Sequence, residues 1–352
     1  MNTLDILYQV FRARHSLVRV QERLERGSRL ALIGPEGWPE KLSSYLGEPV
    51  EHPEGGSGLD RVLILRLPLD DSARESLSGS EAAIVHLGKE LPQADELRNV
   101  AGHIPVEVPC LWVTENEDDV RFQALAATAD LTVPSVRRLD PKDPASALCR
   151  LMMAALPDVA LAVAREFTRA RSEYARRLVQ RSASRNAVIA AASSLPVGSV
   201  PVIGFFLSFL ATTGETLAIT ASQLRLCLMM AALHGRPLDF FDRVSELWPV
   251  VGSAFGWRQL ARELVGRVPV AGWAMKAAVA YSGTWMVGEG SRRFYELGAP
   301  TDEEIQRDLA RRSRREAMRA AEEYLASIRE GMTPEEEPDP FEEAEDQKGE
   351  DR

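Results

Sequence analysis

Short apolar runs alternate with amphipathic segments over the first half of the chain. The runs are rich in Val, Ile and Leu and lie at 29–34, 61–67, 82–88, 108–114 and 130–136. Continuous runs of this length are typical of strands buried on both faces of a parallel sheet. Helical patterns lie between some of them, at 38–46, 93–99 and 118–127. This alternation predicts an α/β domain with a mostly parallel sheet over 27–144.

The segments outside this domain have helical patterns. Apolar positions at helical spacing predict an N-terminal helix over 1–26, and a helical domain is expected over 145–300. A charged helix is predicted over 301–331, with Thr301 and Glu304 as its capping box. The acidic tail at 332–352 is expected to be disordered. The second domain is thus all-α and includes apolar helices that are candidates for embedding in a membrane.

Composition narrows the class of protein only slightly. The net charge of −10 comes mostly from the acidic tail, so the body gives no electrostatic signal for nucleic acid. Three distant cysteines, without metal-ligand spacing, are typical of a reduced cytosolic chain. Asp70–Asp71 and Asp118–Asp119 are expected to be solvated turn residues. No catalytic or metal-binding pattern stands out, so we expect no metal, no nucleic-acid partner and no catalytic residues.

A strand, a glycine turn and a helix follow one another at "RLALIGPEGWPEKLSS", where a phosphate-binding loop would lie. The candidate nucleotide-binding residues are Gly34, Gly37, Lys41 and Ser43. The pattern is broken, because Glu40 stands where the loop lysine belongs and Lys41 comes one residue late. At the fourth strand, Glu115 replaces the lysine of a guanine-binding N-K-x-D motif. We interpret the domain as GTPase-like but degenerate, with GTP as the one cofactor to be tested.

From Asn186 to Gly214 the chain carries no charged residue. The stretch is long enough to span a bilayer, for which about 20 apolar residues suffice. Pro196 and Pro201 interrupt it, and two interpretations remain open: an embedded or re-entrant hairpin, or a buried helix pair. Basic residues precede it, at Arg169, Arg176, Arg177, Arg181 and Arg185. They suit an anionic-lipid contact at the cytoplasmic face, and a solvated helix face is the alternative.

Over about 180–300 the chain resembles the bacterial YcjF-like family, the domain of unknown function 697. The motif positions that carry the resemblance are Pro201, Gln223, Met229, Gly235, Tyr281, Gly283, Thr284, Gly288, Tyr295 and Gly298. The family's acid after the Pro-x-Pro entry is missing here, since Ile203, Gly204 and Phe205 follow instead. The resemblance implies membrane association and a preceding GTPase-like domain, and it implies no reaction.

Three functions follow as hypotheses. The first is a non-enzymatic membrane-associated protein with a pseudo-GTPase-like regulatory or partner-binding domain. It would sit at the cytoplasmic face of the cell membrane, with membrane lipids and an unidentified protein, or another copy of itself, as partners. The second is a divergent GTP- or ATP-binding hydrolase that uses Lys41 and Ser43. The third is a soluble cytoplasmic scaffold whose apolar blocks form one helical core.

Overall fold

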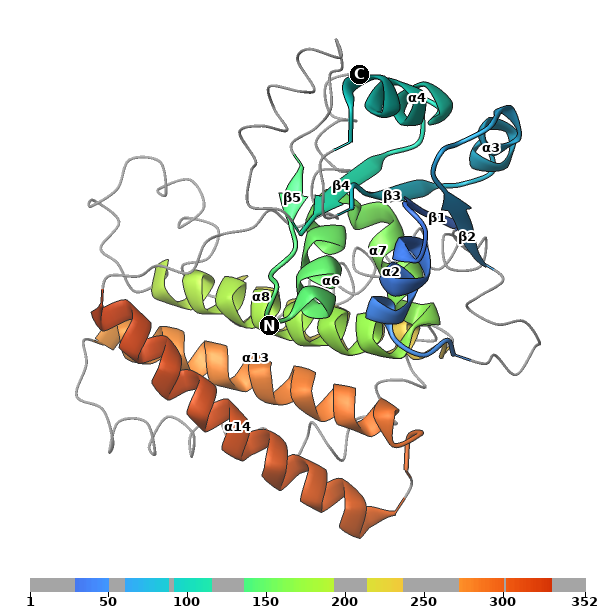
Figure 1. Cartoon of the computed structure of the whole chain (residues 1–352). Coiled ribbons are helices and arrows are strands. Elements are labelled where there is room, and N and C mark those ends of the chain that lie inside the picture. The colour runs from blue at the N-terminus through green and yellow to red at the C-terminus, as the bar shows by residue number, and fades with distance from the viewer. Residues whose placement is uncertain are drawn as a thin grey trace, which may run out of the picture. The chain divides into compact units, whose positions relative to one another are not determined.

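The computed structural model describes seven stretches of the chain, namely 29–50, 61–88, 92–115, 136–192, 214–236, 272–300 and 302–330 (Figure 1). These residues fall into two compact units, one within Glu22–Tyr174 and the other within Ala175–Arg352. The first unit holds the sheet, and the second is helical. The boundary lies inside one helix, beyond the linker at which the sequence predicts the α/β domain to end.

The first unit is built on a parallel sheet of five strands. The strands are β1 (Leu30–Gly34), β2 (Val62–Arg66), β3 (Ala82–His86), β4 (Cys110–Thr114) and β5 (Arg137–Arg138). Their order in the sheet is β2-β1-β3-β4-β5, and all neighbours are parallel. Every residue of β1 and β3 is buried, as continuous apolar runs predict for central strands. The predicted parallel α/β sheet is therefore confirmed.

Helices cover both faces of the sheet (Figure 1). On one face lie α3 (Asp71–Leu77) and α4 (Ala94–His103), whose Leu77 and Leu97 join the sheet residues Ile33, Val85 and Trp112 in one core. On the other face α2 (Trp38–Leu46) packs against β1 and against α6 (Pro144–Ala155). The helix α7 (Pro157–Glu166) follows α6 directly.

Four long helices make up the rest of the described chain. They are α8 (Thr168–Ala192), α10 (Gly214–Leu233), α13 (Gly272–Glu296) and α14 (Glu303–Arg329). The boundary between the units runs through α8. In the second unit α13 and α14 pack side by side along their length (Figure 1). None of the helices in the described ranges combines the length and apolarity that a membrane span requires.

Several local predictions need correction. Asp70 and Asp71 are exposed, as expected, but they lie at the start of a helix and not in a turn. The Asp70 carboxylate accepts from the Ala73 N–H and caps α3, a helix the sequence pattern did not reveal. The cap of α14 is Asp302, which accepts from the N–H groups of Glu304 and Ile305, so Thr301 is not the capping residue. The strand β5 begins directly after the run at 130–136, of which only Val136 lies within the described residues.

Other predictions lie outside the described residues. These are the N-terminal helix, the helix at 118–127, the turn at Asp118–Asp119, the interrupted stretch at 193–213 and the acidic tail.

Candidate functional site

The strand order places a candidate ligand site at the carboxyl ends of β1 and β3. The chain leaves β1 for β2 on one side and returns to β3 on the other side. Ligands of open α/β sheets bind where the strand order reverses in this way, beyond the carboxyl ends of the strands. The predicted phosphate-loop residues lie at this end of the sheet, since β1 ends at Gly34 and α2 begins at Trp38.

The turn between β1 and α2 depends on its glycines. A Cβ at Gly34 would lie 3.2 Å from the carbonyl oxygen of His86 and 3.1 Å from the Cβ of Trp38. Gly37 has φ of 80°, in the left-handed region, and no side chain caps the start of α2. The turn is therefore tight, and the backbone of β1 approaches β3 closely at its end.

Aromatic rings occupy the space above this turn. The indole of Trp38 stacks on the imidazole of His86, the last residue of β3, with ring centroids 3.6 Å apart and planes 9° apart. His86 is fully buried, and its Nδ1 accepts from the N–H of Gly88. Burial, to which the charge of Lys41 adds, lowers the pKa of His86 to about 3, so the imidazole is neutral.

Lys41 is bound to a carboxylate of its own chain. Its Nζ lies 2.9 Å from Oε1 of Glu115, the residue after β4, and 3.9 Å from the centroid of the Trp38 ring. Burial works to lower the pKa of Lys41, and the bonds to Glu115 and Tyr45 outweigh it, so the pKa is raised. Lys41 is thus a charged ammonium whose counter-ion is already in place.

The remaining loop residues do not complete a phosphate site. Glu40 binds Arg66 at the end of β2, and this partner lowers the pKa of the Glu40 carboxyl, so the carboxylate stays charged. Ser43 is half-buried on α2. No group of metal ligands occurs within the described ranges. The geometry brings Gly34, Gly37 and Lys41 together, but it directs Lys41 to Glu115 and stacks Trp38 on His86.

A second polar cluster lies inside the helical unit. The hydroxyl oxygen of Thr284 on α13 accepts from Nδ2 of Asn186 on α8 at 2.8 Å and from Nε2 of Gln223 on α10 at 3.3 Å. All three side chains are buried. Two positions of the sequence motif, Gln223 and Thr284, therefore meet and join three helices through one hydroxyl.

Other motif positions pack around this cluster. A Cβ at Gly288 would lie 2.6 Å from Val179 of α8 and 2.9 Å from Leu226 of α10, so only glycine allows the three helices to approach this closely. Tyr281 stacks on Tyr324 of α14, with centroids 4.6 Å apart.

The other motif positions have packing or turn roles. Met229, Gly283 and Tyr295 are buried, and Gly235 and Gly298 have positive φ just after α10 and α13. Pro201 lies outside the described residues.

The arginines of α8 are distributed around the helix. Arg169, Arg176 and Arg185 are exposed, whereas Arg177 and Arg181 are half-buried. In the Arg-rich segment of α14 at 311–319, Ser313, Ala317 and Met318 are buried, whereas the other face is exposed at Arg311, Arg312, Arg315 and Arg319. Only one face of α14 is therefore solvated.

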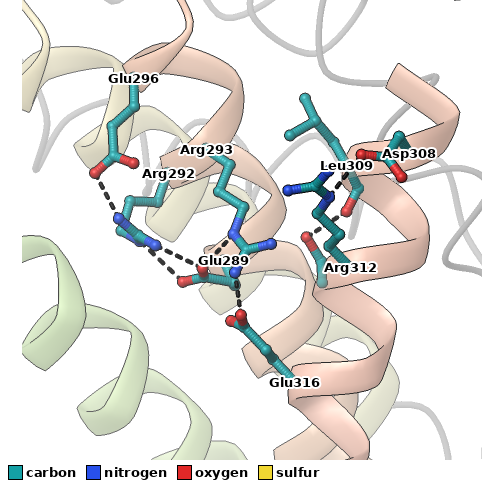
Figure 2. Close-up of polar contacts among 9 residues, drawn as sticks. Glu289, Arg292, Arg293, Glu296, Asp308, Leu309, Arg312 and Glu316 are labelled. Carbon is teal, nitrogen blue, oxygen red and sulfur yellow. Dashed lines mark hydrogen bonds and ion pairs between the residues drawn. The ribbon is translucent and has the colours of Figure 1, made fainter. Parts of the chain in front are cut away.

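An ion cluster links α13 to α14 (Figure 2). The carboxylate of Glu289 is buried and accepts from Arg292 and Arg293, each at 2.6 Å. Arg293 also binds Glu316 of α14, and Arg292 binds Glu296. Figure 2 shows Glu289 next to both guanidinium groups, with Glu316 reaching toward Arg293 from the neighbouring helix.

The two glutamates of this cluster have opposite pKa shifts. Burial works to raise the pKa of Glu289, but the bonds and charge of Arg292 and the bond from Arg293 overcome it, so the pKa is lowered. Burial raises the pKa of Glu316, and the neighbouring Glu289 raises it further. Glu289 is therefore the carboxylate that the folded unit stabilises in its charged form.

Comparison of the chain with protein-family models, with curated proteins and with solved structures gives no match. The geometry of the chain itself therefore carries the functional argument.

The sequence pattern does not reveal which side chains pair within these three clusters. His86 and Glu115 each follow or end a buried strand, and because parallel strands end at one edge, this position was the available signal. Glu289 precedes Arg292 and Arg293 by three and four residues, a spacing that indicates ion pairs on a helix. No sequence signal marks Asn186 as the partner of Thr284, which lies 98 residues away.

The hydroxyl of Thr284 gives a first prediction. Thr284→Val keeps the volume but leaves two buried amide donors without their acceptor, so we expect a loss of about 1–3 kcal/mol in the free energy of unfolding. Thr284→Ser keeps the hydroxyl and loses one methyl group, so we expect it to lower the free energy of unfolding by about 1 kcal/mol. Urea denaturation of both variants compares them. If packing alone mattered, the order would reverse, with the valine variant close to wild type and the serine variant weaker.

The ion cluster gives a second prediction. Glu289→Gln leaves two guanidinium groups without their shared charge and should cost about 2–4 kcal/mol at neutral pH. Because the folded pKa of Glu289 is lowered, this difference from wild type is full at neutral pH and shrinks as the pH falls below 4.5. Glu316→Gln should change stability by less than about 1 kcal/mol, because the folded unit penalises the charged form of Glu316. Equal losses for the two variants in denaturant titrations at several pH values would contradict this assignment.

Proposed function

We propose that the protein is a non-enzymatic, membrane-associated protein whose α/β unit is a regulatory or partner-binding domain of degenerate GTPase-like type. The observation that carries the proposal is the pairing of Lys41 with Glu115. A phosphate-binding lysine needs a free charge at the site where the phosphate lies. Here the carboxylate of Glu115 neutralises the charge of Lys41, and the indole of Trp38 lies against the same ammonium group.

The surroundings of Lys41 support a domain without hydrolysis. A phosphate loop presents backbone N–H groups, a lysine and a hydroxyl to the phosphates and Mg²⁺. In this turn Pro35 has no N–H, Trp38 stacks on His86, and Leu42 occupies the position after Lys41 where the hydroxyl residue belongs. Glu40, on the same helix as Lys41, is a second carboxylate near the turn, and Arg66 keeps it charged. The site is suited to keeping its shape without a ligand.

Membrane association is supported by the basic and uncharged segments and by the resemblance to the YcjF-like family. Three exposed arginines of α8 precede the uncharged stretch that begins at Asn186. Arginines close to an apolar segment attract anionic headgroups, with about 1 kcal/mol for each residue near the surface. We propose the cytoplasmic face of the cell membrane as the location, with anionic lipid as the contact of α8.

Nucleotide binding distinguishes this function from the divergent hydrolase. We expect fluorescently labelled GTP and ATP to show no saturable binding to the full chain in the presence of Mg²⁺. Lys41→Ala should behave like wild type, because the lysine already has Glu115 as its partner.

The variant Glu115→Gln frees Lys41 and serves as the matched control. If the labelled nucleotide binds wild type and not Lys41→Ala, the hydrolase is the correct hypothesis. Binding that appears only in Glu115→Gln would indicate that Glu115 takes the place of a phosphate.

Vesicle flotation tests the membrane contact. The full chain should float with vesicles that contain anionic phospholipid more than with purely zwitterionic vesicles, and salt should weaken the difference. Replacing Arg169, Arg176 and Arg185 together by Ala should weaken the anionic binding at least about tenfold. Gln180→Ala, an exposed change on the same helix, is the control.

Each outcome of the flotation separates one hypothesis from another. A chain that remains unbound by vesicles of either composition would support the scaffold hypothesis. Binding that survives both salt and the triple variant would assign the contact to the uncharged stretch instead of the arginines.

A further inference from the structure

The two edge strands of the sheet differ in length and in polarity. An edge strand offers unpaired backbone groups to other chains, and proteins protect such edges by making them short or charged. The edge strand β5 is protected in both ways, because it has two residues and both are exposed arginines. The opposite edge strand, β2, has five residues, and the first four are Val, Leu, Ile and Leu. Within the described part of the chain, no strand pairs with its outer edge.

The side chains of β2 continue the apolar rows of the sheet up to this edge. Ile64 pairs with Leu32 of β1, which pairs with Ile84 of β3, which pairs with Leu111 of β4. The last three are at most 2% exposed, whereas Ile64 is 39% exposed. On the other face Leu63 and Leu65 pack against the core and are only partly buried. The apolar rows therefore end at β2 where one more strand would bury them.

A groove lies at the same edge, next to the end of β2. It is lined by Ile64, Leu65 and Arg66 of the strand, by Leu69 before α3 and by Ala73 within α3. The groove would offer apolar and polar contacts to the side chains of a strand that pairs with β2.

We propose that β2 pairs in antiparallel fashion with β2 of a second copy of this chain, about a two-fold axis at Ile64. This register places Val62 opposite Arg66, Leu63 opposite Leu65, and Ile64 opposite Ile64 of the other copy. It is the antiparallel register in which all five residues of each strand have a partner. A two-fold interface must be complementary to itself, and here apolar residues face apolar ones at the three central positions.

Charge favours the same arrangement. Arg66 is the one charged residue of β2, and it is held by Glu40 of its own chain. In the register centred on Ile64 the two Arg66 side chains lie at opposite ends of the interface, so like charges do not meet. A shift that placed Arg66 opposite Arg66 would be destabilising. The paired strands would join the two sheets into one continuous sheet of parallel halves.

Sedimentation equilibrium of the full chain over a range of concentrations tests the pairing. Wild type should be a dimer, and Ile64→Lys should raise its dissociation constant at least about tenfold, because two ammonium groups would face each other across the axis. The variant should fold, since Ile64 is already partly exposed in the single chain. Val106→Lys is the matched control, because Val106 is a 99% exposed residue of the same unit, and it should leave the dimer unchanged.

Cross-linking provides a second measurement that does not depend on affinity. In Ile64→Cys the new thiols of the two copies face each other, so a short bis-maleimide should link them, while Val106→Cys should give no more linkage than wild type. Of the native cysteines, Cys149 and Cys227 are buried. The proposal is overturned if wild type is a monomer throughout. It is equally overturned if a dimer persists in Ile64→Lys and Ile64→Cys does not cross-link.

Discussion

The order of the strands is the constraint on which the α/β unit depends. Because β1 lies between β2 and β3, the carboxyl ends of β1 and β3 meet, and Gly34 approaches His86 closely. The same order leaves β2 at the edge with its apolar side chains incompletely covered. The close contact between the ends of β1 and β3 and the exposed edge at β2 therefore both follow from this strand order. A sheet whose strands followed one another in sequence order from one edge would have no such switch point, since the crevice arises where the strand order reverses.

In the helical unit, small side chains and a few buried polar groups determine how the helices pack. Gly288 brings α13 close to α8 and α10, and the Thr284 hydroxyl then lies within reach of amide donors from both helices. Apolar packing alone tolerates sliding of one helix along another, but a buried donor must remain opposite its acceptor. The cluster of Glu289, Arg292, Arg293 and Glu316 performs the same role between α13 and α14. The motif positions on which the resemblance to the YcjF-like family is proposed are, in the described residues, packing positions and helix ends.

Much of the α/β unit was predictable from sequence, because apolar runs and glycine turns act locally. The first four strands and α2 lie where the pattern predicts them. The helix α3 escaped prediction because its sequence, DSARESL, has few apolar residues and depends on Asp70 as its cap. The site was only partly predictable. Gly34, Gly37 and Lys41 follow from their spacing, but the partner of Lys41 lies 74 residues away and is fixed by the sheet order. The hydroxyl of Thr284 has the same property, since its two partners come from two other helices, α8 and α10, that packing brings to α13.

In the proposed function, the Lys41–Glu115 pair would compete with a phosphate at the loop. The two side chains are 40% and 22% exposed, and pairs of this kind contribute about 1 kcal/mol or less to stability. Such a pair is too weak to be the main support of the fold, so its effect is local: it neutralises the one cation that a phosphate would use. The stack of Trp38 on the fully buried His86 is the second element, because moving the indole would uncover a buried imidazole. A ligand at this edge would have to displace an aromatic ring and compete with an internal carboxylate at once. A switch point that is filled in this way supports the proposed partner-binding role, because a fixed surface suits a partner better than it suits a cycle between nucleotide states.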